Sequence, residues 1–251
     1  MSVSTGELKQ WMSTLNMTEA AHVLEESLLD AQSKEWSYGQ FLHHLLRYEL
    51  RRREDKQRAK RMKWAAFPFM KSLDDFRLEE QQSLSKRHME QLRELLWLEH
   101  TYNLILLGPP GVGKTHLSVG LGMEALERGH RVSFVAMDNL IHLLKTQEIA
   151  RTSQTRMKRI LNSDLVIIDD LMFMAMEKSE SNLFFQFVNK LYGQASIILT
   201  SNKGPEDWGE LLGDPAITTA ILDRILHKSE VIKLSGDSFR LKHRETIFGN
   251  S

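Results

Sequence analysis

Residues 108–115 of this chain read GPPGVGKT, and this stretch decides the fold that the sequence predicts. It fits the phosphate-binding pattern G-x-x-x-x-G-K-[ST] at every fixed position. Residues 104–107 before it, LILL, form the short apolar run that is typical of a buried strand, and residues 114–128 after it repeat apolar side chains at helical spacing. The sequence therefore predicts a phosphate-binding loop between a strand and a helix.

The residue types in this stretch suit a bound nucleoside triphosphate. Backbone N–H groups can surround a triphosphate only where side chains do not obstruct them, which explains the glycines. We expect the Lys114 ammonium to contact the β- and γ-phosphates of ATP and the Thr115 hydroxyl to bind Mg²⁺. A turn that merely caps a helix, the alternative, would not require the full pattern. The predicted ATP-binding residues are Gly108, Pro109, Pro110, Gly111, Val112, Gly113, Lys114 and Thr115.

Later segments carry side chains suited to ATP hydrolysis. Residues 164–170, DLVIIDD, form an apolar strand ending in Asp169, expected to hold Mg²⁺, and Asp170, expected to activate the attacking water. Asn202 follows the next apolar strand and could sense the γ-phosphate, although acids and Asn also begin turns and loops. Arg224, in a predicted helix over 217–227, is a candidate arginine finger. The predicted catalytic residues are Lys114, Asp169, Asp170, Asn202 and Arg224, and the predicted metal ligands are Thr115 and Asp169.

The composition sets wider limits on the kind of protein. The 251 residues suffice for one good core and a small accessory domain, and the formal net charge is zero. The absence of cysteine excludes disulfides and thiolate zinc sites. No apolar stretch is long enough to span a bilayer, and the first residues lack the layout of a secretion signal. We expect a soluble, cytoplasmic protein.

The N-terminal part of the chain is predicted to be helical and, toward its end, strongly basic. Apolar residues recur at three- and four-residue spacings from residue 8 to about residue 63. Residues 47–63 contain nine basic and three acidic residues, a net charge of +6, which favours contact with a phosphate backbone. A solvated helix face is the alternative. The predicted DNA-binding residues are Arg47, Arg51, Arg52, Arg53, Arg58, Lys60, Arg61 and Lys63.

Two further segments border the predicted ATP site. Residues 64–76 contain the helix breaker Pro68 and form an apolar linker, whose aromatic rings either pack in the core or lie against the adenine base. Residues 145–163 hold five basic residues against Glu148. This second basic patch either contacts nucleic acid or is a solvated helix.

The segments GPPGVGKTHL, DLVIIDD, ILTSN, DWGELLGDPAITTAILDRILH and SGDSFRLK together resemble the IstB family of insertion-sequence ATP-binding proteins. The resemblance runs nearly from end to end. It implies an α/β fold, a P-loop AAA+ ATPase with a parallel sheet flanked by helices, similar to the helicase loaders DnaC and DnaI. We expect a small all-helical domain at residues 1–66 and the ATPase domain at residues 67–251, without an evident C-terminal lid.

The resemblance also implies a function. Family members are ATP-dependent helpers that form oligomers on duplex DNA and assist a transposase, IstA, in target selection and strand transfer; Arg224 would then act on a neighbouring subunit. Asp170 departs from the Glu that is common in AAA+ proteins, and its shorter side chain would slow hydrolysis. The sequence assigns no role to Arg240. A replicative helicase loader and, from another class, a small-molecule P-loop kinase remain alternatives.

Overall fold

The computed structural model describes residues 3–81, 83–171, 176–211 and 214–242, and the side chain of Arg240 lies outside this description. The chain divides into two compact units, Met1–Lys60 and Arg61–Ser251. The division falls ahead of residue 66, inside a continuous helix. Its physical reason is that Ala65, at the end of this helix, is fully buried in the core of the second unit.

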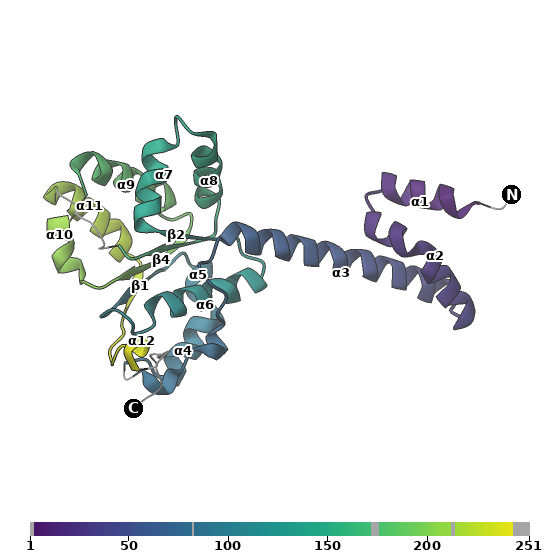
Figure 1. Ribbon diagram of the computed structural model, residues 1–251, viewed down its shortest axis with the longest axis horizontal. Helices are drawn as coiled ribbons and strands as arrows, with labels where there is room; N and C mark the ends of the chain where they lie inside the picture. The colour runs from purple at the N-terminus through teal and green to yellow at the C-terminus, as the bar shows by residue number, and fades with distance from the viewer. Residues whose placement is uncertain (1–2, 82, 172–175, 212–213, 243–251) are drawn as a thin grey trace, which may run out of the picture. The chain divides into compact units, whose positions relative to one another are not determined.

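The first unit is helical. It contains α1 (Thr5–Thr14), α2 (Thr18–Ser33) and the first part of α3 (Tyr38–Ala65), as Figure 1 shows. Ser4 begins α1 through a capping box with Glu7. Only Ala20, Leu24 and Leu45 form a buried apolar cluster among the described residues of this unit. Because so small a core contributes little, polar contacts between the helices carry more weight than usual.

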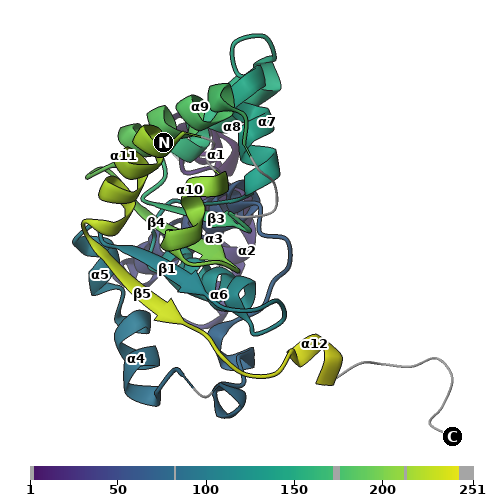
Figure 2. The same cartoon turned by 90° about the vertical axis from the view of Figure 1, so that its left-hand side faces the viewer.

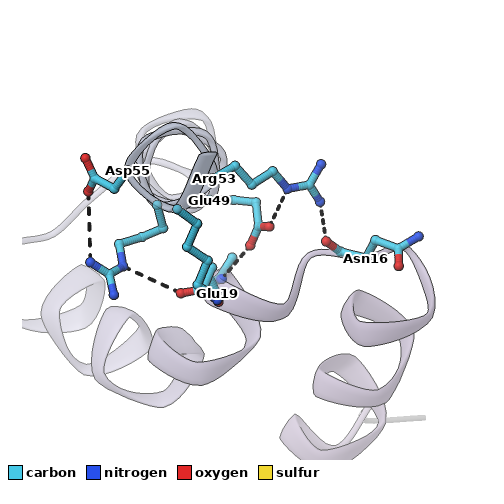
Figure 3. A network of polar contacts seen from close by, with 8 residues as sticks. Asn16, Glu19, Glu49, Arg53 and Asp55 are labelled. Atoms are coloured by element: carbon cyan, nitrogen blue, oxygen red, sulfur yellow. Dashed lines mark hydrogen bonds and ion pairs between the residues drawn. The ribbon is translucent and has the colours of Figure 1, made fainter. Parts of the chain in front are cut away.

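Two acids join α2 to the basic helix α3 (Figure 3). The Glu49 carboxylate, only 4% exposed, accepts the backbone N–H of Ala20 at 2.8 Å and the Arg53 Nε–H at 2.6 Å. Burial opposes the charge of Glu49, but these hydrogen bonds hold its pKa below the ordinary value. Glu19 pairs with Lys56, which lowers the pKa of Glu19. Part of the basic segment therefore stabilises the helical unit itself.

The second unit is built on a parallel five-stranded sheet in the order β2-β3-β4-β1-β5. Figure 2 labels four of these strands, β3, β4, β1 and β5. The strands are β1 (Asn103–Leu107), β2 (Val132–Ala136), β3 (Leu165–Asp169), β4 (Ser196–Ser201) and β5 (Ser229–Lys233). Every residue of β1, β3 and β4 is buried, as expected of parallel strands covered on both faces. The predicted α/β fold is confirmed.

Alternate residues of the strands face two layers of helices. Leu104 and Leu106 of β1 join one core cluster, and Ile105 and Leu107 join the other. One layer holds α4 (Lys86–Glu94), α5 (Leu96–Glu99) and α6 (Lys114–Glu127), and the other holds α7 (Met137–Thr146), α8 (Arg151–Leu161), α9 (Lys178–Leu191), α10 (Trp208–Leu211) and α11 (Pro215–Leu226) (Figure 1). Within the described ranges, no helix has the length and apolar character needed to cross a bilayer.

Short elements complete the unit and differ in part from expectation. They are the 3₁₀ turns η1 (Leu73–Asp75), η2 (Leu78–Glu80) and η3 (Pro205–Asp207), and α12 (Phe239–Lys242) after β5. The apolar residues of 84–98 recur at helical spacing, which predicts a single helix, but Leu95 adopts a left-handed conformation with φ 62° and separates α4 from α5. Leu95 is 1% exposed, so the burial of its side chain offsets the cost of this backbone.

Replacing Glu49 with Ala is expected to loosen the start of α2. The variant leaves the Ala20 N–H without its acceptor, and a buried unsatisfied donor costs about 1–3 kcal/mol. Hydrogen–deuterium exchange at the first turn of α2 should therefore be faster in Glu49→Ala than in the wild type at pH 7. Because the pKa of Glu49 is lowered, its contribution is complete above the unfolded-state pKa and is lost as the pH falls through the folded-state pKa.

Glu54→Ala, at an exposed position of the same helix, is the matched control and should exchange like the wild type. Equal exchange in Glu49→Ala and Glu54→Ala would contradict the role given to Glu49.

Candidate functional site

The phosphate-binding loop connects β1 to α6 at the carboxyl edge of the sheet. Lys114, only 6% exposed, folds back over this loop. Its Nζ donates to the carbonyl oxygens of Gly108 at 2.7 Å and Pro109 at 2.9 Å, and to Oδ1 of Asn202 at 2.6 Å. Gly113 precedes α6 and offers no side-chain cap, so the first-turn N–H groups of the helix can serve an anion.

The two predicted acids lie beside the loop. The Thr115 hydroxyl donates to Oδ1 of Asp169 at 3.0 Å, and the Thr200 hydroxyl donates to the same oxygen at 2.7 Å. Asp170 follows with a left-handed φ of 56° and lines the adjoining cavity. The structure therefore brings together Lys114, Thr115, Asp169, Asp170 and Asn202.

The surroundings of Asp169 fit a magnesium ion. Burial raises the pKa of Asp169 and the neighbouring Asp170 charge adds to this, while the hydroxyls of Thr200 and Thr115 and the Lys114 ammonium oppose it. Mg²⁺ prefers hard oxygen ligands and usually combines one or two protein ligands with phosphate oxygens and water. The Asp169 carboxylate and the Thr115 hydroxyl beside the phosphate-binding loop match that requirement.

A cavity of about 870 Å³ opens beside the loop. Its far wall comes from the linker, from residues 80–81 and from the segment after β5. The His116 ring lies edge-on to Phe76, with 5.3 Å between ring centroids, and to Phe69, with 6.5 Å. Phe76 is 9% exposed and packs in the core, as one of the two roles considered for the linker aromatics requires. Phe69 is 36% exposed and lines the cavity, and contact of this ring with an adenine base stays a prediction.

The segment after β5 also reaches the loop. The Leu234 N–H donates to the Leu107 carbonyl at 2.7 Å, and the Phe239 N–H donates to the Gly111 carbonyl at 3.0 Å. Asp237 and Phe239 line the cavity. Residues 234–239 are therefore hydrogen-bonded to the end of β1 and to the loop. Other nucleotide-binding proteins can use a lid at such a place.

Arg224 lies apart from the other predicted catalytic residues. Its Nε donates to Asn189 at 2.9 Å, and its guanidinium lies 4.9 Å from the centre of the Phe185 ring. Arg224 lines a small hollow together with Asn103 and Ile197, which lie at the beginnings of β1 and β4. It is therefore near the amino edge of the sheet, opposite the edge that carries Lys114.

The predicted DNA-binding residues of α3 fall into two groups. Arg53 is bound by Glu49, and Arg52 lies 3.5 Å from Glu19, so both have partners inside the helical unit. These two side chains therefore also stabilise the helical unit, and contact of Arg52 and Arg53 with DNA stays a prediction. Arg61 is half-buried. The other predicted residues, Arg47, Arg51, Arg58, Lys60 and Lys63, are exposed, as are Arg52 and Arg53.

The second basic patch, residues 145–163, also contains a cation with partners inside the fold as well as exposed cations. The Arg156 guanidinium donates to the carbonyls of Trp64 and Phe134, each at 2.7 Å, and desolvation lowers its pKa. Arg156 thus fixes the end of α3 to β2. Arg151 and Lys158 are exposed on α8, a helix without a carboxylate.

Sequence reasoning missed Thr200 and His116. Thr200 lies two residues before Asn202. Its hydroxyl reaches Asp169 only because β3 pairs with β4, and no local sequence pattern reveals that pairing. His116 directly follows the loop pattern and could have been found there.

Comparison with known proteins identifies relatives along nearly the whole chain. The model of the family described as IstB-like ATP binding proteins matches residues 10–247. A Pseudomonas aeruginosa protein, named as an ATP-binding protein of insertion sequence IS21, is 39% identical over 238 residues, covering 95% of this chain and 90% of that protein.

Two solved structures share the fold of the second unit. DnaA from Aquifex aeolicus, bound to AMPPCP, matches with a TM-score of 0.55 and 24% identity, over 70% of this chain and 54% of its own. DnaI matches with a TM-score of 0.56 and 20% identity, over 66% of this chain and 91% of its own. The P-loop AAA+ fold is thereby confirmed.

Replacing Gly113 with Ala is expected to disrupt the loop. Gly113 has φ 98°, and a Cβ there would lie 2.9 Å from Cε2 of Phe76. Gly129→Ala is a matched control, because Gly129 has φ 95° but no atom within 4 Å of an added Cβ. In both variants an alanine must adopt a left-handed backbone conformation, which costs about 1–3 kcal/mol of stability. Only Gly113→Ala should also weaken binding of a fluorescent ATP analogue, by about tenfold or more. Equal affinities in the two variants would show that the contact with Phe76 is unimportant.

Proposed function

We propose that this chain, which belongs to the family of IstB-like ATP-binding proteins, is an ATP-dependent DNA-binding helper of transposition. In this proposal it binds and hydrolyses ATP with Mg²⁺ and forms oligomers on duplex DNA. The assembly assists a transposase of the IstA type in target selection and strand transfer, and hydrolysis remodels it. The name of the Pseudomonas aeruginosa relative, which refers to an insertion sequence, supports this setting.

The observation that carries the proposal is the meeting of Lys114, Thr115, Asp169 and Asn202 at one edge of the sheet. Lys114 and the N–H groups of α6 would bind the phosphates, and Thr115 and Asp169 would hold Mg²⁺, which stabilises the charge of the phosphates when bound. Asp170 faces the cavity and would accept a proton from the attacking water. Its side chain is one methylene shorter than Glu, so hydrolysis is expected to be slow.

The position of Arg224 supports the proposal that several subunits assemble. It lies near the opposite edge of the sheet from Lys114 and therefore cannot serve its own nucleotide without a large rearrangement. Asn189 and Phe185 hold the guanidinium in place, which suits a group that stabilises phosphoryl charge in a neighbouring subunit.

Exposed cations support contact with DNA. Arg47 and Arg51 lie one helical turn apart on α3 and share a face. Arg151 and Lys158 lie two turns apart on α8. Rows of this kind suit a phosphate backbone, which is recognised by charge and not by sequence.

The first test is DNA binding with and without nucleotide. The protein should bind duplex DNA cooperatively in the presence of a non-hydrolysable ATP analogue, and more weakly without it, at fixed salt. A preference for single-stranded DNA of equal length would favour the helicase loader, and phosphorylation of small acceptors would favour the kinase.

Arg47→Ala/Arg51→Ala should weaken duplex binding and make the logarithmic salt dependence shallower by about 0.9 for each phosphate contact removed. Lys86→Ala/Arg87→Ala removes the same charge from exposed positions in the first turn of α4, and serves as the control. Unchanged binding by Arg47→Ala/Arg51→Ala would exclude this face of α3 as a DNA contact.

Arg224→Ala should bind ATP but hydrolyse it poorly, whereas Lys114→Ala should lose ATP binding and DNA-bound assembly together. A mixture of the two variants should regain part of the activity, because a Lys114→Ala subunit can supply Arg224 to an intact site. A mixture no more active than its components would argue against a finger acting between subunits.

A further inference from the structure

Thr200 occupies a position between the two acids that none of the roles described so far uses. It lies in β4 and is fully buried, with 0% exposure. Its hydroxyl donates to Oδ1 of Asp169 at 2.7 Å and accepts the backbone N–H of Asp170 at 2.9 Å. Its own carbonyl accepts the N–H of Leu171 at 3.0 Å. One residue therefore bonds to three consecutive residues at the end of β3.

These contacts define where the two carboxylates lie. A threonine hydroxyl can donate one hydrogen bond, and here it donates to the Asp169 carboxylate. Its oxygen accepts a hydrogen bond from the Asp170 N–H. The N–H contact holds Asp170 at φ 56°, a left-handed conformation that a residue other than Gly adopts only when neighbours enforce it. Asp170 then lines the cavity, while Asp169 stays against Thr115.

We infer that Thr200 is a positioning residue that holds Asp169 toward the metal position and turns Asp170 toward the attacking water. The inference rests on the proposed function, because it gives Thr200 a role in the same ATP site. Among the described residues, the buried hydroxyl of Ser163 gives a contrast: it donates to Ser133 at 2.8 Å, away from the two acids.

Thr200→Val tests the inference, since valine keeps the β-branched shape and removes the hydroxyl, and Thr200→Ser restores the hydroxyl. Thr218→Val is the matched control, because Thr218 is 4% exposed and its hydroxyl donates to the Asp214 carbonyl, away from the loop. Two quantities would be measured on the full chain: the steady-state kcat and KM for ATP, and the affinity for Mn²⁺ in complex with a non-hydrolysable ATP analogue, followed by electron paramagnetic resonance.

Loss of a residue that orients a metal ligand typically costs 10–100-fold in metal affinity or activity. Thr200→Val should therefore lower kcat and Mn²⁺ affinity by about tenfold or more, while KM stays within about threefold because the phosphate loop is unchanged. Thr200→Ser should recover most of both losses, and Thr218→Val should match the wild type in both measurements.

Wild-type kcat and Mn²⁺ affinity in a folded Thr200→Val variant would overturn the inference and leave the proposed function intact. Equal losses in Thr200→Val and Thr218→Val would also overturn it, because they would reflect general destabilisation. A wild-type protein that binds Mn²⁺ and nucleotide without hydrolysing ATP would remove the hydrolytic part of the proposed function, and Mn²⁺ affinity would still decide the role of Thr200. A wild-type protein that binds no nucleotide would overturn both.

Discussion

A carboxylate at the end of a buried strand is stable only where donors surround it, and the nucleotide site depends on how Asp169 meets this condition. Two hydroxyls reach the same carboxylate oxygen, one from Thr115 on the loop helix and one from Thr200 on the neighbouring strand. The interactions that make the buried charge tolerable therefore also connect the loop, β3 and β4. Stability and chemistry share the same hydrogen bonds here, so the loop is ordered by the groups that would act on its ligand.

Local patterns predicted the parts of the fold and site that depend on neighbours in sequence. The loop, its strand and its helix lie within one short stretch, and the strand ends at Asp169 and before Asn202 follow from apolar runs that stop at polar residues. Thr200 could not be found in this way, because its partners lie on another strand. Leu95 breaks a regular helical pattern only because burial in the finished core offsets its left-handed backbone.

The basic helix α3 shows a second limit of reasoning from sequence. A run of cations looks uniform along the chain, yet Glu49 and Glu19 divide it by facing Arg53, Arg52 and Lys56. A buried acid at a helix N-terminus needs such partners, so these cations belong to the architecture of the helical unit. The net charge of residues 47–63 therefore overstates the number of cations that could contact DNA.

The strand order has a consequence for the order in which a new chain can fold. β1 pairs only with β4 and β5, which are made much later, whereas β2 and β3 follow each other in the chain and pair with each other. At translation rates of about 5–20 residues per second, the apolar β1 waits for several seconds without its sheet neighbours. Lys114 cannot meet Asn202 until β4 has left the ribosome. The later strands, and not the loop itself, thus set the moment at which a nascent chain first becomes competent to hold a nucleotide.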